Sequence, residues 1–491
     1  MRPSRTEWII LGVVVAARVA ALVSLELTTY ADFPLVDAQT YWQQATTLLE
    51  GRDPFSEGLY QPPGYPAVLA AFGWLSGELT MAAIRRLQLV LGCLTSLGLL
   101  VLGRRLGSRL GAPWAGAAAV LLFSLYPTTL LFEGDLLTPA LTNAALVGAL
   151  LCLLNTHWWR APFAGALMGL AVVCHPTYLF AAGWLAAWRG MMPDGRRALA
   201  GFTVAFALSL SPTVVRNYQD FGAFTPVSHN AGLNLYLGNN PGWRGTSSMR
   251  AGLEFRQLAL EAEPHRRDTA ERNKYWRDRA ITGIIEHPDA WAAAVATKAV
   301  WSVNNTEIPR NEDYRCRIEE PSLQWLGWLP VRYGWVFPFA LLGAAGAIRR
   351  RDREGVALAG AWVALHLPMV LFLVADRYRL ATWPLICLLA PLGAVVLRDL
   401  VRARSPWLLG VLVAAAIPWA SIDEVTDKDP AWCRHVQGNL AYMVGERDEA
   451  MRLYQESLAL DGDNMSARTY VASMLTAAGE HRRAAEQMDE V

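Results

Sequence analysis

Residues 356–375 read VALAGAWVALHLPMVLFLVA, a run without Asp, Glu, Lys or Arg. A helix of about 20 apolar residues rises far enough to cross the hydrocarbon core of a bilayer. Comparable runs occupy residues 115–125, 140–154 and 408–416. None of them has the polar stripe that a helix on the surface of a soluble protein carries. The sequence therefore predicts an all-α, polytopic membrane helix bundle.

The composition supports a membrane protein and gives no sign of a nucleic-acid-binding protein. Of the 491 residues 53% are hydrophobic and 18% are charged, and the net charge is +1. No basic run suggests binding to nucleic acid. Cys93, Cys152, Cys174 and Cys387 fall in apolar segments and are expected to be small core residues, whereas Cys316 and Cys433 fall in polar parts and could pair. No spacing of Cys and His indicates a metal site, so no cofactor is expected, although a divalent metal stays possible.

The distribution of arginine predicts the topology, because short cytoplasmic loops are enriched in basic residues. Arg2 and Arg5 place the N-terminus in the cytoplasm, and the run from Arg349 to Arg353 is the strongest inside signal. We expect about 11 crossings, among them helices near residues 8–25, 81–103, 198–215 and 331–348, with the segment at 290–303 lying at the interface. Residues 32–66, residues 216–330 and the C-terminal tail are then outside the cytoplasmic (inner) membrane, on its periplasmic face.

This topology gathers polar side chains at the outer helix ends. They are Asp37, Glu133, Asp135, His175, Asp376, Arg377 and Arg379. Acids at the end of a membrane helix are costly unless they are solvated, paired or functional. The pattern indicates an active site at the outer face.

Residues 32–66, DFPLVDAQTYWQQATTLLEGRDPFSEGLYQPPGYP, form the first outer loop. Asp37 and Tyr41 are four residues apart and share one face of a short helix. An adjacent apolar stripe on that helix (Ala38, Trp42, Ala45 and Leu49) suits a position on the membrane surface. Asp37 could cap the helix N-terminus, act as a general base, or do both.

Two arginines flank Tyr378 directly after an apolar run. Snorkelling towards lipid headgroups would explain one of them. The pair Arg377 and Arg379 also suits a phosphate group, because each guanidinium offers a planar fork of donors. Lys298 is a second cationic candidate, for which snorkelling is the simpler interpretation.

The tail, residues 421–491, is charged and acidic, with 14 Asp/Glu against 7 Lys/Arg from Asp423 onwards. Gly445 and Gly479 are 34 residues apart, as are Ala450 and Ala484. This period is typical of tetratricopeptide repeats, and an amphipathic helix hairpin is the alternative. A tetratricopeptide-like tail would offer a surface for a protein partner.

Several motifs in order resemble the C-type (GT-C) polytopic membrane glycosyltransferases, in the branch of the aminoarabinose transferases and protein O-mannosyltransferases. They are Asp37 with Tyr41, then QPPGYP at 61–66, SPTVVRNY at 211–218, GLNLYLGNNP at 232–241, NTEI at 305–308 and RYRL at 377–380. The resemblance covers about residues 8–400. It implies a catalytic membrane domain over residues 1–420 that moves a sugar, with inversion, from a polyprenyl-phosphate donor to a lipid, glycan or protein acceptor.

The resemblance also implies roles for single residues. Asp37 would be the catalytic aspartate, and either Glu133 or Asp135 the second acid. Arg377 and Arg379, with Lys298 as a further candidate, would hold the donor phosphate, and Tyr41, Tyr378 and Glu307 would contact substrate. His175-Pro176 stands where relatives often have Arg-Pro, so a phosphate contact there is doubtful.

Three alternatives belong to other classes of reaction or protein. A glycan ligase or polymerase of the outer face would use a polyprenyl-diphosphate donor. A transporter would show a repeated hydropathy pattern and broken helices near the midplane. A membrane scaffold that displays repeats would leave the acids at the outer helix ends unexplained.

Overall fold

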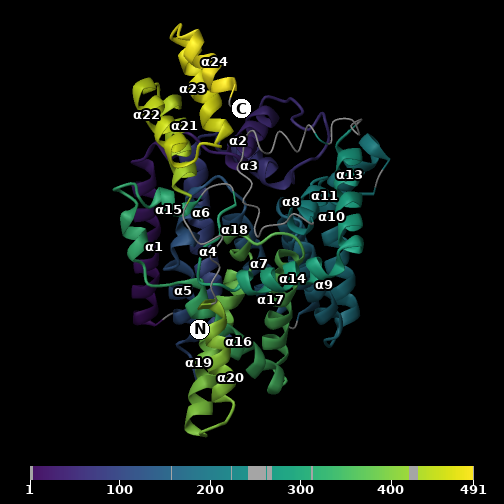
Figure 1. Ribbon diagram of the computed structural model, residues 1–491. Coiled ribbons are helices and arrows are strands. Elements are labelled where there is room, and N and C mark those ends of the chain that lie inside the picture. The colour runs from purple at the N-terminus through teal and green to yellow at the C-terminus, as the bar shows by residue number, and fades with distance from the viewer. Residues whose placement is uncertain are drawn as a thin grey trace.

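The computed structural model describes residues 4–155, 157–222, 224–240, 261, 268–310, 313–419 and 429–489. Within these ranges every regular element is a helix, and the long helices run roughly along one axis (Figure 1). The predicted all-α class is confirmed.

The N-terminal half contains α1 (Arg5–Glu26), η1 (Thr29–Ala31), α2 (Asp37–Leu49), α3 (Gly64–Ser76), α4 (Met81–Ser108), α5 (Ala115–Ser124), α6 (Pro127–Gly134), α7 (Pro139–Leu153), η2 (Trp158–Arg160), α8 (Ala161–Cys174), α9 (Tyr178–Gly190), α10 (Gly195–Phe221) and α11 (Ala231–Asn239). The C-terminal half contains α13 (Thr269–Glu286), α14 (Pro288–Ser302), α15 (Tyr314–Arg317), η4 (Gln324–Trp328), α16 (Tyr333–Arg349), α17 (Arg353–Leu371), α18 (Asp376–Arg379), α19 (Trp383–Arg402), α20 (Leu408–Ala416), η5 (Ile417–Trp419), α21 (Pro430–Met443), α22 (Arg447–Leu460), α23 (Met465–Ala477) and α24 (His481–Asp489).

Among the described residues, five helices are long and apolar enough to cross a membrane, namely α1, α4, α10, α17 and α19. The pair α5 and α6 passes the same test together but is bent by 59°, and shorter apolar helices lie at Pro139–Leu153, Trp158–Cys174 and Leu408–Trp419. These helices confirm a multi-pass membrane bundle. The count of 11 crossings and the orientation remain predictions.

The outer surface of the bundle carries large apolar side chains. On α1, Trp8, Ile9 and Val13 are more than half exposed, and on α20 Leu409 and Leu412 are about two-thirds exposed. Apolar area of this extent is unfavourable in water and is the normal surface of a helix that contacts lipid.

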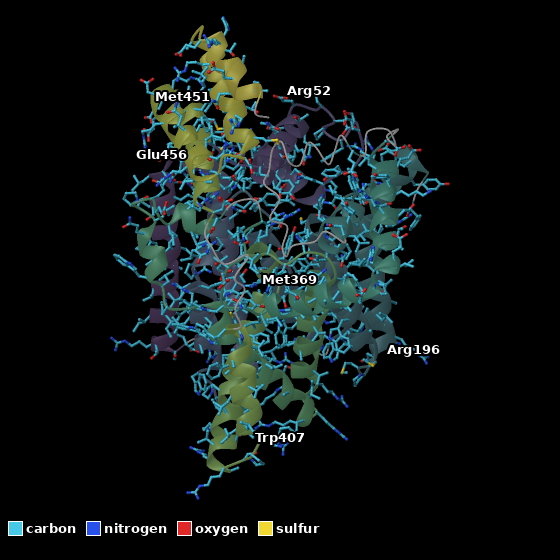
Figure 2. The ribbon with its side chains drawn as sticks, viewed as in Figure 1. Arg52, Arg196, Met369, Trp407, Met451 and Glu456 are labelled. Carbon is cyan, nitrogen blue, oxygen red and sulfur yellow. A yellow bond between two sulfur atoms is a disulfide. The ribbon has the colours of Figure 1, made fainter. Side chains whose placement is uncertain are left out.

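Segments predicted on opposite sides of the membrane lie at opposite ends of the molecule. Figure 2 places Arg52 of the first predicted outer loop and Met451 of the tail at one end, and Arg196 and Trp407 towards the other. The arrangement is the one that the arginine pattern predicts.

The apolar stripe of α2 packs against protein instead of lying on a membrane surface. Ala38 and Ala45 are buried in a cluster that includes Tyr65 and Leu69 of α3. The prediction of a surface-lying helix is wrong, because α3 follows closely in the chain and covers the stripe.

The tail folds as two helix pairs, α21 with α22 and α23 with α24. Their turns contain Gly445 and Gly479, whose φ angles of 89° and 81° are readily adopted only by glycine. The 34-residue period is therefore present in the backbone. The assignment to tetratricopeptide repeats and the protein partner remain predictions.

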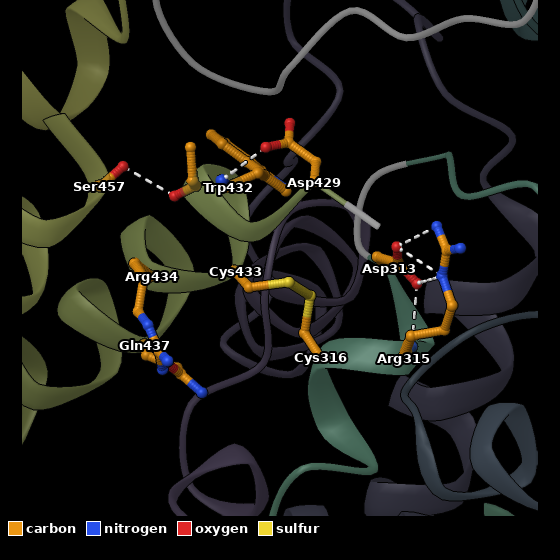
Figure 3. The surroundings of a disulfide bond; sticks show 10 residues. Asp313, Arg315, Cys316, Asp429, Trp432, Cys433, Arg434, Gln437 and Ser457 are labelled. Carbon is orange, nitrogen blue, oxygen red and sulfur yellow. Dashed lines mark hydrogen bonds and ion pairs between the residues drawn. A yellow bond between two sulfur atoms is a disulfide. The ribbon is translucent and has the colours of Figure 1, made fainter. Parts of the chain in front are cut away.

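A disulfide joins Cys316 of α15 to Cys433 of α21 (Figure 3). Beside it, Trp432, Val436 and Leu440 of α21 are buried against a cluster that includes Leu25 of α1. The first tail helix is thus an integral part of the membrane domain's packing. The predicted boundary at residues 420 and 421 lies outside the described residues.

Candidate active site

A cavity of about 1270 Å³, here called the large cavity, opens between the first predicted outer loop, the loops that follow α8 and α17, and the tail. Asp37, His175, Arg377 and Tyr378 line it, although they are far apart in the sequence. The predicted topology gathered these residues at one membrane face, and tertiary packing gathers them at one site.

Asp37 is the first residue of α2. Its Oδ1 accepts a hydrogen bond from Gln61 Nε2 at 3.0 Å, and its Oδ2 pairs with an Arg377 guanidinium nitrogen at 2.5 Å. The two charged side chains are 19% and 18% exposed, so the pair is partly desolvated yet reachable from the cavity. Val36 occupies the N-cap position, so the prediction that Asp37 is the N-cap is wrong.

Arg377 and Tyr378 form one charged unit with Asp37. The Arg377 guanidinium lies 5.1 Å from the Tyr378 ring centroid and donates to its hydroxyl at 3.3 Å. Burial lowers the pKa of Arg377, but Tyr378 and Asp37 raise it by more, so its net pKa shift is upward. The guanidinium is therefore a permanent positive charge in a site that excludes much of the water.

His175 lies at the end of α8, 5.6 Å from Tyr378 between ring centroids. Its Nδ1 is hydrogen-bonded to Thr177 Oγ1 at 2.6 Å. Burial, with a further contribution from Arg377, lowers the pKa of His175 to about 4, and Asp37 opposes the shift. The imidazole is neutral at pH 7, so His175 supplies no positive charge to the site.

Sequence reasoning missed two cations that line the large cavity, Arg272 and Arg310. Arg310 donates weakly to Asn234 Oδ1 at 3.5 Å, and its buried Nε has no partner within the described part of the chain. Arg310 follows the motif NTEI at 305–308 by two residues. This closeness to a motif is the feature of the sequence that could have identified Arg310 as a site residue.

The two candidate second acids have different surroundings. Glu133 pairs with Arg18 at 2.8 Å within the helix bundle, and both side chains are buried. Asp135 pairs with Arg317 and lines a side cavity of about 40 Å³, and Asp37 and Arg377 line that same side cavity. Asp135 therefore shares a wall with Asp37, whereas Glu133 is not among the described residues that line either cavity.

Asp376 precedes Arg377 and lines the side cavity. Its side chain is 1% exposed, and its Oδ1 accepts the Arg377 backbone N–H at 2.6 Å. Burial and the nearby Glu307 carboxylate raise the pKa of Asp376 well above its usual range. Asp376 thus positions the backbone that carries Arg377.

Besides Glu133, three predicted site residues, Arg379, Glu307 and Lys298, line neither cavity in the described structure. Arg379 is fully buried, lies 3.8 Å from Glu307 and donates to the Thr306 carbonyl at 2.7 Å. Glu307 in turn accepts a hydrogen bond from the Tyr126 hydroxyl. These contacts anchor the loop after α14 to α18, which favours a structural role for both residues.

Lys298 is buried beneath α11. Its Nζ donates to the Gly238 carbonyl and to Asn239 Oδ1, each at 2.9 Å. Burial lowers the pKa of Lys298 to about 8. Its donors are used by the fold, and this argues against the predicted phosphate contact and against snorkelling.

The predicted substrate contacts Tyr41 and Tyr378 both line the large cavity. The Tyr41 ring packs edge-on against Tyr65 at 5.3 Å, and burial raises its pKa. Tyr41 is therefore a neutral phenol. In the described ranges no cluster of three or more His, Cys, Asp or Glu side chains could hold a metal ion.

No family model and no curated protein matches the chain. Among solved structures, the chain is similar to the archaeal oligosaccharyltransferase AglB from Archaeoglobus fulgidus in complex with an inhibitory peptide and a dolichol-phosphate, with TM-score 0.43 and 14% identity over 92% of this chain. It spans 59% of that protein's length. It is also similar to ArnT from Cupriavidus metallidurans bound to undecaprenyl phosphate, with TM-score 0.43 and 15% identity over 99% of this chain and 76% of the other.

Proposed function

We propose that the chain is an inverting glycosyltransferase that moves a sugar from a polyprenyl-phosphate donor to a lipid, glycan or protein acceptor at the outer face of the cytoplasmic membrane. The observation that carries the proposal is the ion pair of Asp37 and Arg377 on the wall of the large cavity. Such a reaction needs a base for the acceptor and a cation for the departing phosphate within one site.

The reaction is a single displacement. Asp37 takes the proton from the acceptor's hydroxyl or amine, and the acceptor's lone pair forms a bond to the anomeric carbon. The bond between that carbon and the phosphate oxygen breaks on the opposite face, and its electron pair stays on the phosphate. The fixed positive charge of Arg377 stabilises the negative charge that develops on the phosphate. Because Arg377 is already in place in a partly dry site, this stabilisation requires no reorganisation of solvent.

Arg377 donates a hydrogen bond to Asp37 Oδ2. A donor phosphate competes for the guanidinium, and as it binds, the Asp37 carboxylate loses part of its stabilisation and becomes more basic. Arg310 lines the same cavity with a buried Nε and supplies a second contact to the phosphate. We assign the second acid to Asp135, because it shares the side cavity with Asp37.

The shape of the large cavity favours a lipid-linked donor. Apolar side chains among its lining residues are here called the apolar flank, namely Leu233, Met369, Phe372, and Leu179 and Phe180 of α9. Leu179 and Phe180 are 40% and 42% exposed, so the apolar flank reaches the outside of the bundle. A polyprenyl chain could lie along this flank while its phosphate reaches Arg377.

The disulfide between Cys316 and Cys433 supports an outer location of the tail and of the large loop at residues 216–330. Disulfides persist in oxidising compartments such as the bacterial periplasm and are rare in the cytosol. The arginine pattern predicts the same side.

The test is the variant Asp37→Asn in reconstituted membranes. Because the sugar is unidentified, a panel of polyprenyl-phosphate hexoses and pentoses is supplied with an extract of envelope acceptors, and released polyprenyl phosphate is measured. We expect the variant to be slower by about 10² to 10⁴-fold, the usual contribution of a general base. Binding of undecaprenyl phosphate should persist, because Arg377 and Arg310 are unchanged.

The matched control is Asp32→Asn, which removes an exposed acid from the same loop. It should keep the wild-type rate. A normal rate in folded Asp37→Asn protein would contradict the assigned base, and the absence of turnover with every donor in the wild-type protein would contradict the function.

A polyprenyl-diphosphate donor is the second candidate, and it would make the chain a glycan ligase or polymerase. Arg272, Arg310 and Arg377 all line the large cavity, and this number of cations favours a more highly charged leaving group. Competition between undecaprenyl phosphate and undecaprenyl diphosphate for binding separates the two. A preference for the diphosphate of tenfold or more, about 1.4 kcal/mol, would favour the second candidate.

A further inference from the structure

The tail supplies part of the wall of the large cavity. Seven tail residues line the same cavity as Asp37, namely the apolar Val436 and Met443 and five aromatic or polar residues, which are Trp432, His435 and Asn439 of α21 and Ser466 and Tyr470 of α23. We call these five residues the tail wall. The tail is thus inside the site, whereas the sequence suggested only a surface for a protein partner.

Two independent connections hold the tail wall in place. The disulfide fixes Cys433, which lies between Trp432 and His435, to α15 (Figure 3). Trp432 and Val436 are also buried against Leu323 and Leu326 beside η4. A segment held by a covalent bond and by apolar packing has a fixed position relative to the catalytic residues.

The tail wall differs in chemistry from the rest of the tail. From Asp423 onwards the tail has 14 acids and 7 basic residues, yet no Asp, Glu, Lys or Arg is among the tail residues that line the cavity. The charges are kept on the solvated faces. An uncharged wall of polar, aromatic and apolar side chains suits a neutral ligand with hydroxyl groups and apolar C–H faces, because a charged ligand would leave its charge unpaired there.

Tyr470 and Asn439 are the two residues best placed to contact such a ligand. The Tyr470 ring is stacked on Tyr454 at 5.1 Å and 9°, and the residue is 38% exposed. Asn439 Oδ1 accepts the Tyr454 hydroxyl at 2.8 Å, and its Nδ2 lies 3.2 Å from His435 Nε2. A rigid aromatic face beside an oriented amide with spare donor and acceptor capacity is suited to a sugar ring, which has an apolar C–H face and polar edges.

We propose that the tail wall is the acceptor subsite and that the acceptor presents a neutral sugar unit to Tyr470 and Asn439. This deepens the proposed function and rests on it. The tail then selects glycan acceptors, and the disulfide keeps the subsite at a fixed distance from Asp37.

The test compares matched pairs of variants on the same helices. Tyr470→Ala and Asn439→Ala alter the tail wall. The controls Thr469→Ala on α23 and Gln437→Ala on α21 remove a hydroxyl and an amide that are not among the tail-wall residues. With neutral oligosaccharides of a few hexose units as probe, we expect the tail-wall variants to raise the acceptor KM about tenfold or more with kcat little changed, and the controls to stay within about twofold.

Folding and donor binding are measured on every variant. Intact disulfide and an unchanged thermal midpoint show that Tyr470→Ala is folded, and Tyr470→Phe, which keeps the ring, should retain most acceptor affinity. Undecaprenyl phosphate affinity should not change. An unchanged acceptor KM in folded Tyr470→Ala, or an equal loss of donor affinity, would overturn the inference.

Direct binding separates this inference from the proposed function. Oligosaccharide binding to the wild-type protein, lost in Tyr470→Ala, would support the tail wall even if no donor were turned over. If the wild-type protein transfers sugar and the tail-wall variants have an unchanged acceptor KM, the proposed function stands and the acceptor subsite is refuted. A peptide that competes for the wall while oligosaccharides do not bind would also refute it.

Discussion

The unusual backbone conformation of Val36 orients the side chain of Asp37. Val36 has φ 49° and ψ −112°, a region in which a β-branched residue is rare and costs of order 1–3 kcal/mol. The turn at Val36 starts α2 at Asp37, whose carboxylate meets both Gln61 and Arg377. Strain of this kind persists only where the surrounding structure determines it, and it is concentrated at functional sites.

His175 predicts a dependence of stability on pH. Its pKa is about 4 in the folded protein against 6.5 for the free side chain, because burial and Arg377 disfavour the charged form. The unfolded chain therefore binds the extra proton first, and stability that is present above pH 6.5 is lost as the pH falls through this window to about 4. Relative to His175→Gln, the wild type should lose on the order of 2 kcal/mol at pH 5.

The measurement is the difference in thermal midpoint between wild type and variant from pH 7.5 to 4.5. His481→Gln, on the exposed helix α24, is the control and should follow the wild-type curve. A constant difference between wild type and His175→Gln across this range would contradict the argument.

Helix α6 shows how one short element separates two acids of the same type. The bend of 59° between α5 and α6 directs α6 across the bundle. Glu133, in its last turn, faces Arg18 of α1, while Asp135 lies just beyond the helix end beside Arg317. Two residues of separation thus place one carboxylate inside the bundle and the other at the side cavity.

This separation predicts different phenotypes for the two acids. Glu133→Gln leaves Arg18 buried without its counter-ion, which typically costs about 3–5 kcal/mol, so the thermal midpoint in detergent should fall sharply. Asp135→Asn should lose transfer activity and cost less stability than Glu133→Gln, because the pair of Asp135 with Arg317 is more exposed than the pair of Glu133 with Arg18. The double variant Arg18→Met with Glu133→Leu removes both charges and should recover much of the stability.

A stable Glu133→Gln protein without activity would reverse this assignment. In that case Glu133 would be the second acid. The activity assay and the unfolding measurement together decide between the two.

At the scale of the whole molecule, the site depends on contacts between distant parts of the chain. The large cavity joins residues from Asp37 to Tyr470, and the disulfide closes a loop of 117 residues between α15 and α21. The bond restricts the unfolded chain and keeps the tail over the cavity.

Replacing Cys433 by Ser should lower the free energy of unfolding by about 2–4 kcal/mol. It should also raise the acceptor KM, because the tail wall is no longer held to α15. Cys387→Ser, a buried free cysteine of α19, is the control that leaves the disulfide intact.

The same cysteines report the orientation of the chain. A maleimide reagent that does not cross membranes should label Cys316 and Cys433 in intact cells only after a reductant has been added. Labelling that requires permeabilised cells would place the tail in the cytoplasm and contradict the outer-face proposal.

The amino-acid sequence alone was sufficient to predict the all-α membrane bundle. The apolar side chains of runs such as residues 356–375 are unfavourable in water, and in a bilayer the backbone of such a run must satisfy its hydrogen bonds within a helix. It was also sufficient for the gathering of Asp37, His175 and Arg377 at one end, because arginine in short loops follows membrane orientation. Motif order singled out Asp37 among the acids of its loop. These features depend on local composition and on order along the chain.

Only the tertiary structure decided which charged groups meet. Arg379 and Lys298 carry the same charge as Arg377 and lie near motifs, yet packing assigns their donors to Thr306 and Asn239. Pairing energies depend on distances of a few ångströms and on burial, which neither composition nor spacing encodes. For the same reason the position of the tail on the wall of the large cavity followed from the disulfide and the apolar contacts of α21.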